Sequence, residues 1–142
     1  MKIVMMAAAA ALLATPAMAQ TPAPLQVEIP ELPTAVNDPT CGGKVGLAQQ
    51  ARCVMTTQGA IGGLVDAYSE AFRLQNWLAA GGENNRVVYV RRRPEGGCDG
   101  FQMLAFADES RVPGPAEPAW LAFAAIPGDV CAARPATPAP AQ

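Results

Sequence analysis

Apolar side chains recur with a helical period in two stretches near the middle of the chain. When successive residues are placed about 100° apart, the apolar side chains of residues 60–80 share one stripe and most charged side chains lie opposite. Gly81 and Gly82 follow this stretch, and glycine commonly stands just after the last residue of a helix. The pattern predicts an amphipathic helix over residues 60–80. A shorter stretch with the same period predicts a second helix within residues 44–55.

Three later stretches have the apolar pattern of strands, at residues 86–92, 101–107 and 120–126. The last of them is rich in alanine and follows Pro118, which would also suit a short helix. Read as strands, the three form an antiparallel meander. The predicted fold class is therefore α+β, with an amphipathic helix packed on a three-stranded antiparallel meander, a short N-terminal helix and stabilising disulfides.

One register of the last two strands satisfies several pairs together. If Phe106 lies opposite Phe123, Cys98 comes to lie opposite Cys131, at a separation that a disulfide can bridge. The register therefore predicts a disulfide between Cys98 and Cys131 next to an aromatic pair.

Cys41 and Cys53 are then left to form a second disulfide with each other. A straight helix would hold them roughly 18 Å apart, so the chain has to fold back after Cys41, which the two following glycines permit. The cysteines contain no C-x-x-C pair and the chain has no histidine, so a metal site is not expected. Four cysteines in an exported chain usually form two disulfides.

The N-terminus has the three parts of a secretory signal peptide. Lys2 provides the positive charge, residues 3–13 are an unbroken apolar run, and a small-residue cleavage site at residues 17–19 precedes Gln20. The run is shorter than the about 20 residues that span a bilayer, and no cysteine follows the cleavage site to carry a lipid. We therefore expect residues 1–19 to be removed and the protein to reach a bacterial periplasm or the exterior, without a membrane span or lipid anchor.

The rest of the 142-residue chain divides by composition into three parts. Residues 20–40 form a proline-rich N-terminal arm, residues 41–133 a single α+β domain, and residues 134–142 an alanine- and proline-rich tail that is predicted to be disordered. The net charge of the whole chain is −2, and removal of Lys2 with the signal peptide makes it −3. Nucleic-acid-binding domains are usually strongly basic, so nucleic acid is not expected as a partner.

The composition excludes several kinds of catalytic site. Without histidine, neither a Ser-His-Asp nor a Cys-His arrangement is possible. The glycine pairs match no phosphate-binding loop or dinucleotide fingerprint, so no cofactor is expected. Asp66 and Glu70 are the only paired acids on a predicted regular element, and Arg73 is close enough to pair with Glu70. A carboxylate-based enzyme is therefore only the third hypothesis for the function.

The predicted sheet has a second face, opposite the long helix. Its candidate binding residues form an apolar cluster with an arginine at the rim: Tyr89, Arg91, Leu104, Phe106 and Phe123. Such a cluster is either a partner site or is covered by residues 25–55, which must pack somewhere.

Trp77 lies on the polar side of the predicted long helix, near Arg73. It is either an exposed binding anchor stacked on Arg73, or it packs under the proline-rich arm. Both residues are therefore candidate binding residues.

Together these features predict an exported, non-enzymatic binding or envelope-accessory protein, whose partner is a protein or another cell-envelope component. The alternative is an inhibitor of a secreted hydrolase that acts through residues 108–119. This proline-rich connection is long for a hairpin, and long ordered loops are often functional. The same loop could instead be only a rigid connector.

Overall fold

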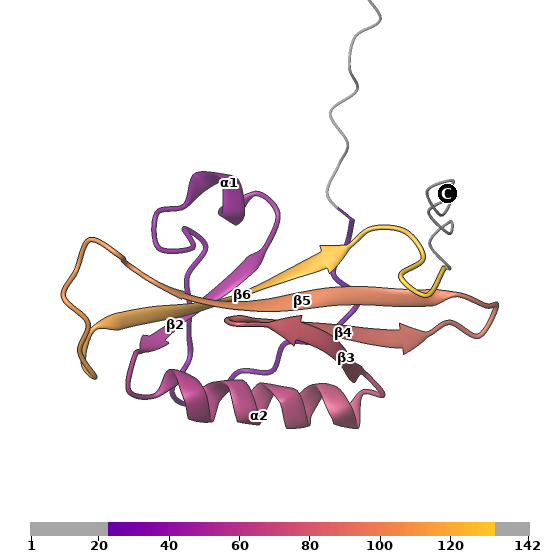
Figure 1. Cartoon of the computed structure of the whole chain (residues 1–142), viewed down its shortest axis with the longest axis horizontal. Coiled ribbons are helices and arrows are strands. Elements are labelled where there is room, and N and C mark those ends of the chain that lie inside the picture. The colour runs from indigo at the N-terminus through magenta and orange to yellow at the C-terminus, as the bar shows by residue number, and fades with distance from the viewer. Residues whose placement is uncertain (1–22, 133–142) are drawn as a thin grey trace, which may run out of the picture.

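The computed structural model describes residues 23–132, so the predicted signal peptide and the predicted tail at residues 134–142 lie outside the described residues. The elements in chain order are β1 Val36–Asn37, α1 Val45–Ala48, β2 Arg52–Thr57, α2 Ile61–Leu74, β3 Leu78–Glu83, β4 Arg86–Arg92, β5 Cys98–Ala107 and β6 Pro118–Ile126. The strands form one antiparallel sheet in the order β1-β2-β6-β5-β4-β3. The helix α2 covers one face of the sheet, and α1 lies over the other face (Figure 1).

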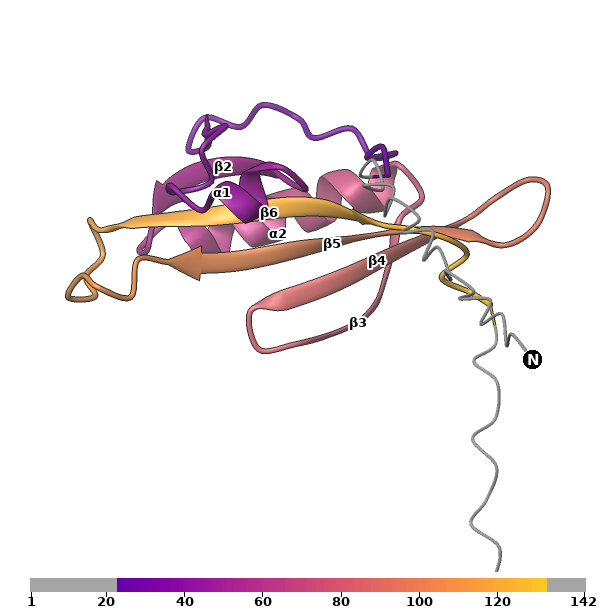
Figure 2. The ribbon, with the colours of Figure 1, turned by 90° about the horizontal axis from the view of Figure 1, so that it is seen from above.

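The predicted fold class is wrong, because the sheet has six strands rather than three and the helices are shorter than expected. β4, β5 and β6 coincide closely with the three predicted strands, but they are inner strands of a larger sheet. β2 and β3 lie outside them on either side (Figure 2). Both of these strands begin within regions that the sequence pattern predicts to be helical.

The predicted long helix ends early and is followed by a strand. α2 stops at Leu74, and Asn76 then adopts a left-handed backbone conformation, with φ of 64°. The chain reverses there into β3, which forms a hairpin with β4. A Cβ atom on Gly82 would collide with the carbonyl oxygen of Arg86. Gly82 thus allows two strands to approach closely, whereas the sequence pattern took it for the end of a helix.

The predicted helix within residues 44–55 is reduced to the single turn α1. The chain then enters β2, where successive side chains point to opposite faces of the sheet. Val54 is buried in the core on the α2 side, and Cys53 is buried on the α1 side. Because both faces of β2 are covered, its apolar residues do not alternate strictly along the sequence, and a helical period fits them as well.

The strands β5 and β6 pair three residues away from the predicted register. Phe106 lies opposite Trp120, and Phe123 lies opposite Met103. An odd shift turns every side chain of one strand to the other face of the sheet. Phe123 therefore points toward α2, while Phe106 points away from it.

The core beneath α2 is built around one aromatic ring. Phe72 is fully buried, and its ring makes edge contacts with the rings of Tyr89, Phe101 and Phe123, at centroid distances of 5.2, 5.0 and 5.8 Å. Such edge-to-face pairs add to the free energy gained from burying the rings. This cluster fixes α2 on the sheet.

The N-terminal arm packs against the same core without forming a strand before Val36. Val27 and Ile29 are buried there. The backbone of Glu28 exchanges two hydrogen bonds, of 2.9 and 2.8 Å, with the side-chain amide of Gln75 just after α2. The arm therefore contributes apolar burial and polar contacts to the domain.

Both predicted disulfides are present. Cys41 is joined to Cys53 and Cys98 to Cys131. Disulfides of this kind form and persist in oxidising compartments, which suggests that the protein is exported. Among residues 23–132, neither helix has the length and apolar character needed to cross a membrane.

Candidate functional site

The candidate residues of the predicted second face do not form one surface. Tyr89 and Phe123 are buried beneath α2, whereas Leu104 and Phe106 lie on the opposite face and pack against the cluster around Cys41 and Cys53. The three-residue difference in register separates them, because residues that share a face in one register lie on different faces in the other. Tyr89 also makes an internal hydrogen bond of 2.7 Å with the Ser69 hydroxyl.

Trp77 is part of the core rather than an exposed anchor. Its side chain is only 1% exposed, and the guanidinium of Arg91 lies 4.4 Å from the centre of its ring. Arg91 also donates to the carbonyl oxygen of Gln26 in the N-terminal arm at 3.4 Å. Arg73, the predicted stacking partner of Trp77, instead forms a salt bridge with Glu70, with 2.6 Å between its guanidinium nitrogen and the carboxylate oxygen. Trp77 and Arg91 therefore connect the arm to the sheet.

The acidic pair on α2 is solvated. Arg73 donates to both carboxylate oxygens of Glu70, and these hydrogen bonds lower the pKa of the carboxyl group. Asp66 is also exposed. An exposed carboxylate that is held ionised by an arginine lacks the raised pKa that a general acid needs at neutral pH.

The connection between β5 and β6, at residues 108–117, is held against the turn that leads into α2. Gln58 and Gly59 donate their backbone N–H groups to the carbonyl oxygens of Glu117 and Pro115, at 2.8 and 2.9 Å. The backbone N–H of Gly114 donates to the side chain of Gln58 at 3.2 Å. Three hydrogen bonds thus fasten the second half of this loop to a neighbouring turn. The loop lies at one end of the molecule, away from the β4–β5 connection (Figure 1, Figure 2).

The first half of the loop is held by a small polar network. Asp108 accepts hydrogen bonds from the hydroxyl and backbone N–H of Ser110, at 2.6 and 2.9 Å, and these lower the pKa of its carboxyl group. The guanidinium of Arg111 lies between two carboxylates, 3.6 Å from Asp108 and 3.1 Å from Glu117. Arg111 therefore links the beginning of the loop to its end.

The tip of the loop is apolar and exposed. Val112 is 85% exposed, which makes it the most exposed large hydrophobic residue in the described part of the chain. Pro113 follows it and Pro115 comes two residues later, and the fixed φ angle of proline restricts the backbone here. The loop presents one aliphatic side chain on a braced backbone.

A row of apolar side chains crosses four strands at the base of the loop. Cross-strand pairs join Val36 to Met55, Met55 to Trp120, and Trp120 to Phe106, so the four residues share the face opposite α2. We name these four residues the apolar row. Its aromatic end is stacked, with ring centroids 5.6 Å apart. Its aliphatic end is open, since Val36 is 60% and Met55 37% exposed.

Residues 41–44 cover the aromatic end of the apolar row. Gly42 lies against the indole of Trp120, so close that a Cβ atom there would lie 3.0 Å from the ring. The ammonium group of Lys44 lies 5.6 Å from the centre of the Phe106 ring. Of the four members, only Phe106 was a predicted candidate. Val36 and Met55 were missed because β1 and β2 were not predicted, and Trp120 was missed because the predicted register places it on the other face of the sheet from Phe106. The apolar residues along 52–57 do not alternate strictly, so the sequence holds no local signal that could have found β2.

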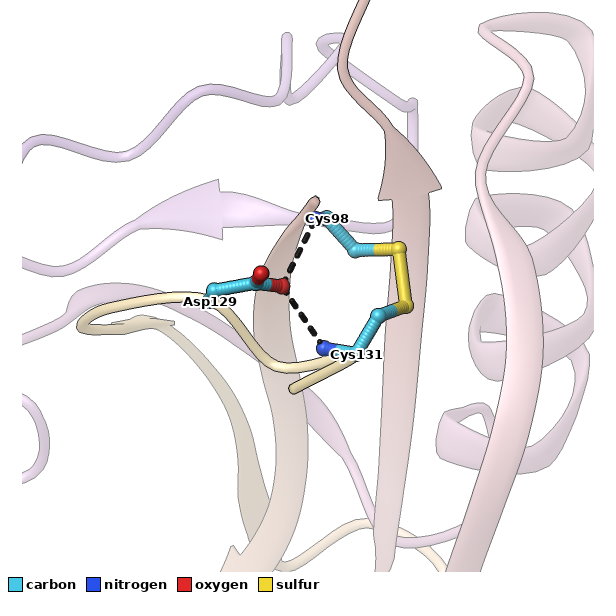
Figure 3. A group of neighbouring side chains, drawn as sticks. All are labelled: Cys98, Asp129 and Cys131. Carbon is cyan, nitrogen blue, oxygen red and sulfur yellow. Dashed lines mark hydrogen bonds between the residues drawn. A yellow bond between two sulfur atoms is a disulfide. The ribbon is translucent and has the colours of Figure 1, made fainter. Parts of the chain in front are cut away.

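Cys98, Asp129 and Cys131 are close enough together to resemble a metal site, but their chemistry does not fit one (Figure 3). Both sulfur atoms belong to the disulfide, so neither is a thiolate ligand. The Asp129 carboxylate accepts hydrogen bonds of 2.9 Å from the backbone N–H groups of Cys98 and Cys131, which lower its pKa. Asp129 thus braces the disulfide.

The chain matches no protein-family model, no curated protein and no solved structure.

Proposed function

We propose that this protein is an exported, non-enzymatic binding protein that recognises a partner protein through residues 108–117. The observation that carries the proposal is the 85% exposure of Val112 on a loop that is fastened to a neighbouring turn and braced by Arg111. An aliphatic side chain at a loop tip adds nothing to the core, and holding it rigidly in water suits recognition better than it suits a connector.

The bracing supports recognition because binding normally costs conformational freedom. A flexible loop has to be ordered when a partner docks, whereas a loop already held in one conformation avoids most of that cost. The open end of the apolar row, at Val36 and Met55, adds apolar area on a neighbouring part of the molecule. We propose that the partner is a protein of the periplasm or the extracellular space, in keeping with the two disulfides and the predicted signal peptide.

A second candidate function is inhibition of a secreted hydrolase by the same loop. The observation that favours it is the sequence Val112-Pro113 at the exposed tip. Val112 could fill a hydrolase pocket that accepts small apolar side chains, and the bracing would keep the loop in place after docking. The following proline nitrogen carries no hydrogen, so the next peptide unit cannot donate a hydrogen bond as an ordinary substrate would.

The proposal is tested by placing a photo-crosslinking amino acid at position 112 in the full chain, expressed in its native compartment. Leu74 is the matched control site, because it is 70% exposed at the end of α2, away from the loop. We expect a discrete adduct from position 112 and none from position 74. Gln58→Ala, which removes the acceptor for the Gly114 N–H, should weaken the adduct. Identical adducts from both sites, or none from position 112, would contradict the proposal.

The inhibitor function is distinguished by a direct assay. The purified protein and its Val112→Asp variant are titrated into secreted proteases that prefer small apolar residues. Inhibition by the wild type alone supports this function. If crosslinking succeeds but neither protein inhibits any of these proteases, the loop binds a partner without acting as an inhibitor.

A further inference from the structure

A cavity of about 330 Å³ lies between the N-terminal arm, β2 and α2. This volume is at the lower end of the range for small-molecule sites, which begins at about 300 Å³. Leu32, Pro33 and Val54 supply apolar lining. Its lining residues lie between Pro30 and Tyr68, and none of them belongs to the 108–117 loop.

Tyr68 of α2 also lines this cavity, and its hydroxyl group is unsatisfied. The side chain is 0% exposed, and its Oη has no hydrogen-bond partner in the part of the chain that the structure describes. Buried polar groups nearly always have a partner, because an unpaired one loses its hydrogen bonds to water without replacement. Tyr89 shows the usual arrangement, since its hydroxyl bonds to Ser69. The Tyr68 hydroxyl is therefore a hydrogen-bonding group without a partner on a residue that lines the cavity.

A positive charge lines the same cavity, because Arg52 is among its lining residues. Arg52 lies directly opposite Phe123 in the pairing of β2 with β6, so both side chains are on the α2 side. The ring of Phe123 is in edge contact with that of Tyr68, at a centroid distance of 5.0 Å. Within residues 23–132, no carboxylate lies within salt-bridge distance of Arg52. Burial raises the pKa of Tyr68, and the charge of Arg52 acts against that rise, which agrees with this placement.

We propose that this cavity binds a small monocarboxylate with an apolar body. The Tyr68 hydroxyl and the Arg52 guanidinium donate to the carboxylate, as arginine commonly does in a two-point contact. The apolar body lies against Leu32, Pro33 and Val54. The one acidic side chain in the lining, Glu31, disfavours a doubly charged anion such as phosphate. This site is independent of the protein recognition proposed for the loop.

Benzoate is a suitable probe, and benzamide is its uncharged control of the same shape. Binding to the full chain is followed by calorimetry and by backbone amide NMR shifts. We expect saturable benzoate binding, with shifts at Arg52, Val54 and Tyr68, and much weaker binding of benzamide. A hydrogen bond to a charged group contributes enough binding free energy that Tyr68→Phe should weaken benzoate binding roughly tenfold or more. We expect the same loss of affinity for Arg52→Gln. Arg86→Gln, an exposed arginine on β4, should leave the affinity unchanged.

The stability of the Tyr68→Phe variant without benzoate provides a second measurement. If the hydroxyl forms its hydrogen bond only when a ligand is bound, its removal should leave the melting temperature of the free protein unchanged or raise it. Equal affinity for benzoate and benzamide, or no binding of either, would overturn the proposal. So would a lower melting temperature of Tyr68→Phe, because the hydroxyl would then be satisfied inside the free protein by a buried water.

Discussion

The indole Nε1 of Trp120 donates a hydrogen bond of 2.8 Å to the carboxylate of Asp38, which lies 82 residues earlier in the chain. The same carboxylate accepts hydrogen bonds from the Thr40 hydroxyl at 2.7 Å and from the Gly42 backbone N–H at 2.9 Å. Asp38 therefore holds together the turn before α1 and the aromatic end of the apolar row. No other carboxylate in residues 23–132 joins segments so far apart in sequence.

Replacing Asp38 by asparagine should destabilise the protein in a manner that depends on pH. The hydrogen bonds, above all that from the Thr40 side chain, lower the pKa of Asp38 from 3.8 to about 2. Because the folded-state pKa is depressed, the stabilisation is present above about pH 4 and is lost as the pH falls through about 2. We expect Asp38→Asn to cost roughly 1–3 kcal/mol at neutral pH.

Urea unfolding of wild type and variant, measured from pH 7 down to pH 2, tests this expectation. The difference in the free energy of unfolding should be constant down to pH 4 and should then narrow. Comparing the two proteins cancels the contributions of Asp108 and Asp129, whose pKa values are also lowered. A difference that stays constant down to pH 2 would show that the ionised form of Asp38 has no special role.

Phe123→Ala and Phe106→Ala should differ clearly in their effect on stability. Phe123 is fully buried among the rings beneath α2, and loss of such a core aromatic typically costs about 3–5 kcal/mol. Phe106 is only partly buried and stacks on Trp120, so the lost burial and the lost ring contact together should cost less, about 2 kcal/mol. The free energies of unfolding of both variants are measured by chemical denaturation and compared with that of the wild type. Equal losses would contradict the observed register of β5 and β6.

Arg91→Lys should loosen the N-terminal arm. A lysine ammonium lacks the planar guanidinium that lies over Trp77 and reaches Gln26, and such a contact is worth roughly 0.5–2 kcal/mol. Hydrogen exchange should speed up at residues 25–29, while exchange in β5 and β6 stays slow. Arg92→Lys on the same strand is the control, since Arg92 is exposed and lies on the other face of the sheet. Equal acceleration in both variants would argue against this role.

Removing the Cys98–Cys131 disulfide by a double serine substitution should cost roughly 2–5 kcal/mol, the usual range for small secreted domains. Asp129→Ala keeps the disulfide and removes only its hydrogen-bonding carboxylate, so it should cost less. Thermal unfolding of the two variants compares these effects. A smaller loss from the double substitution than from Asp129→Ala would show that the turn, not the covalent bond, carries the stability.

The sequence predicted β4 residue for residue, because its strand pattern is local. It also predicted both disulfides, although the register of β5 and β6 from which they were derived is wrong. It did not predict the register of β5 and β6. That prediction assumed that regular pairing extends as far as Cys131, but the sheet ends at Ile126 and a turn at residues 127–130 leads back to Cys98. Because this turn brings Cys131 back to Cys98, the disulfide forms although the strand register differs by three residues from the predicted one. No periodicity in the sequence reveals the turn.

The candidate sites were predictable only in part. The 108–117 loop is visible as a long proline-rich connection, although its bracing by Gln58 and Gly59 depends on a turn that is distant in sequence. The apolar row and the cavity at Tyr68 both require β2 to lie beside β6. Pairing between strands so far apart in sequence leaves no local signal, so neither feature could be predicted.

The position of β2 in the sheet also constrains how the chain folds. β2 is synthesised early, yet its main pairing partner is β6, the last strand within residues 23–132. The hairpins of β3, β4 and β5 and the Cys41–Cys53 loop can close over short distances, whereas the β2–β6 contact has to bring remote segments together, which slows folding. Until β6 arrives, β2 keeps an unpaired edge that could join the strands of other chains. The slow step of folding is therefore also the step at which this protein is most exposed to aggregation.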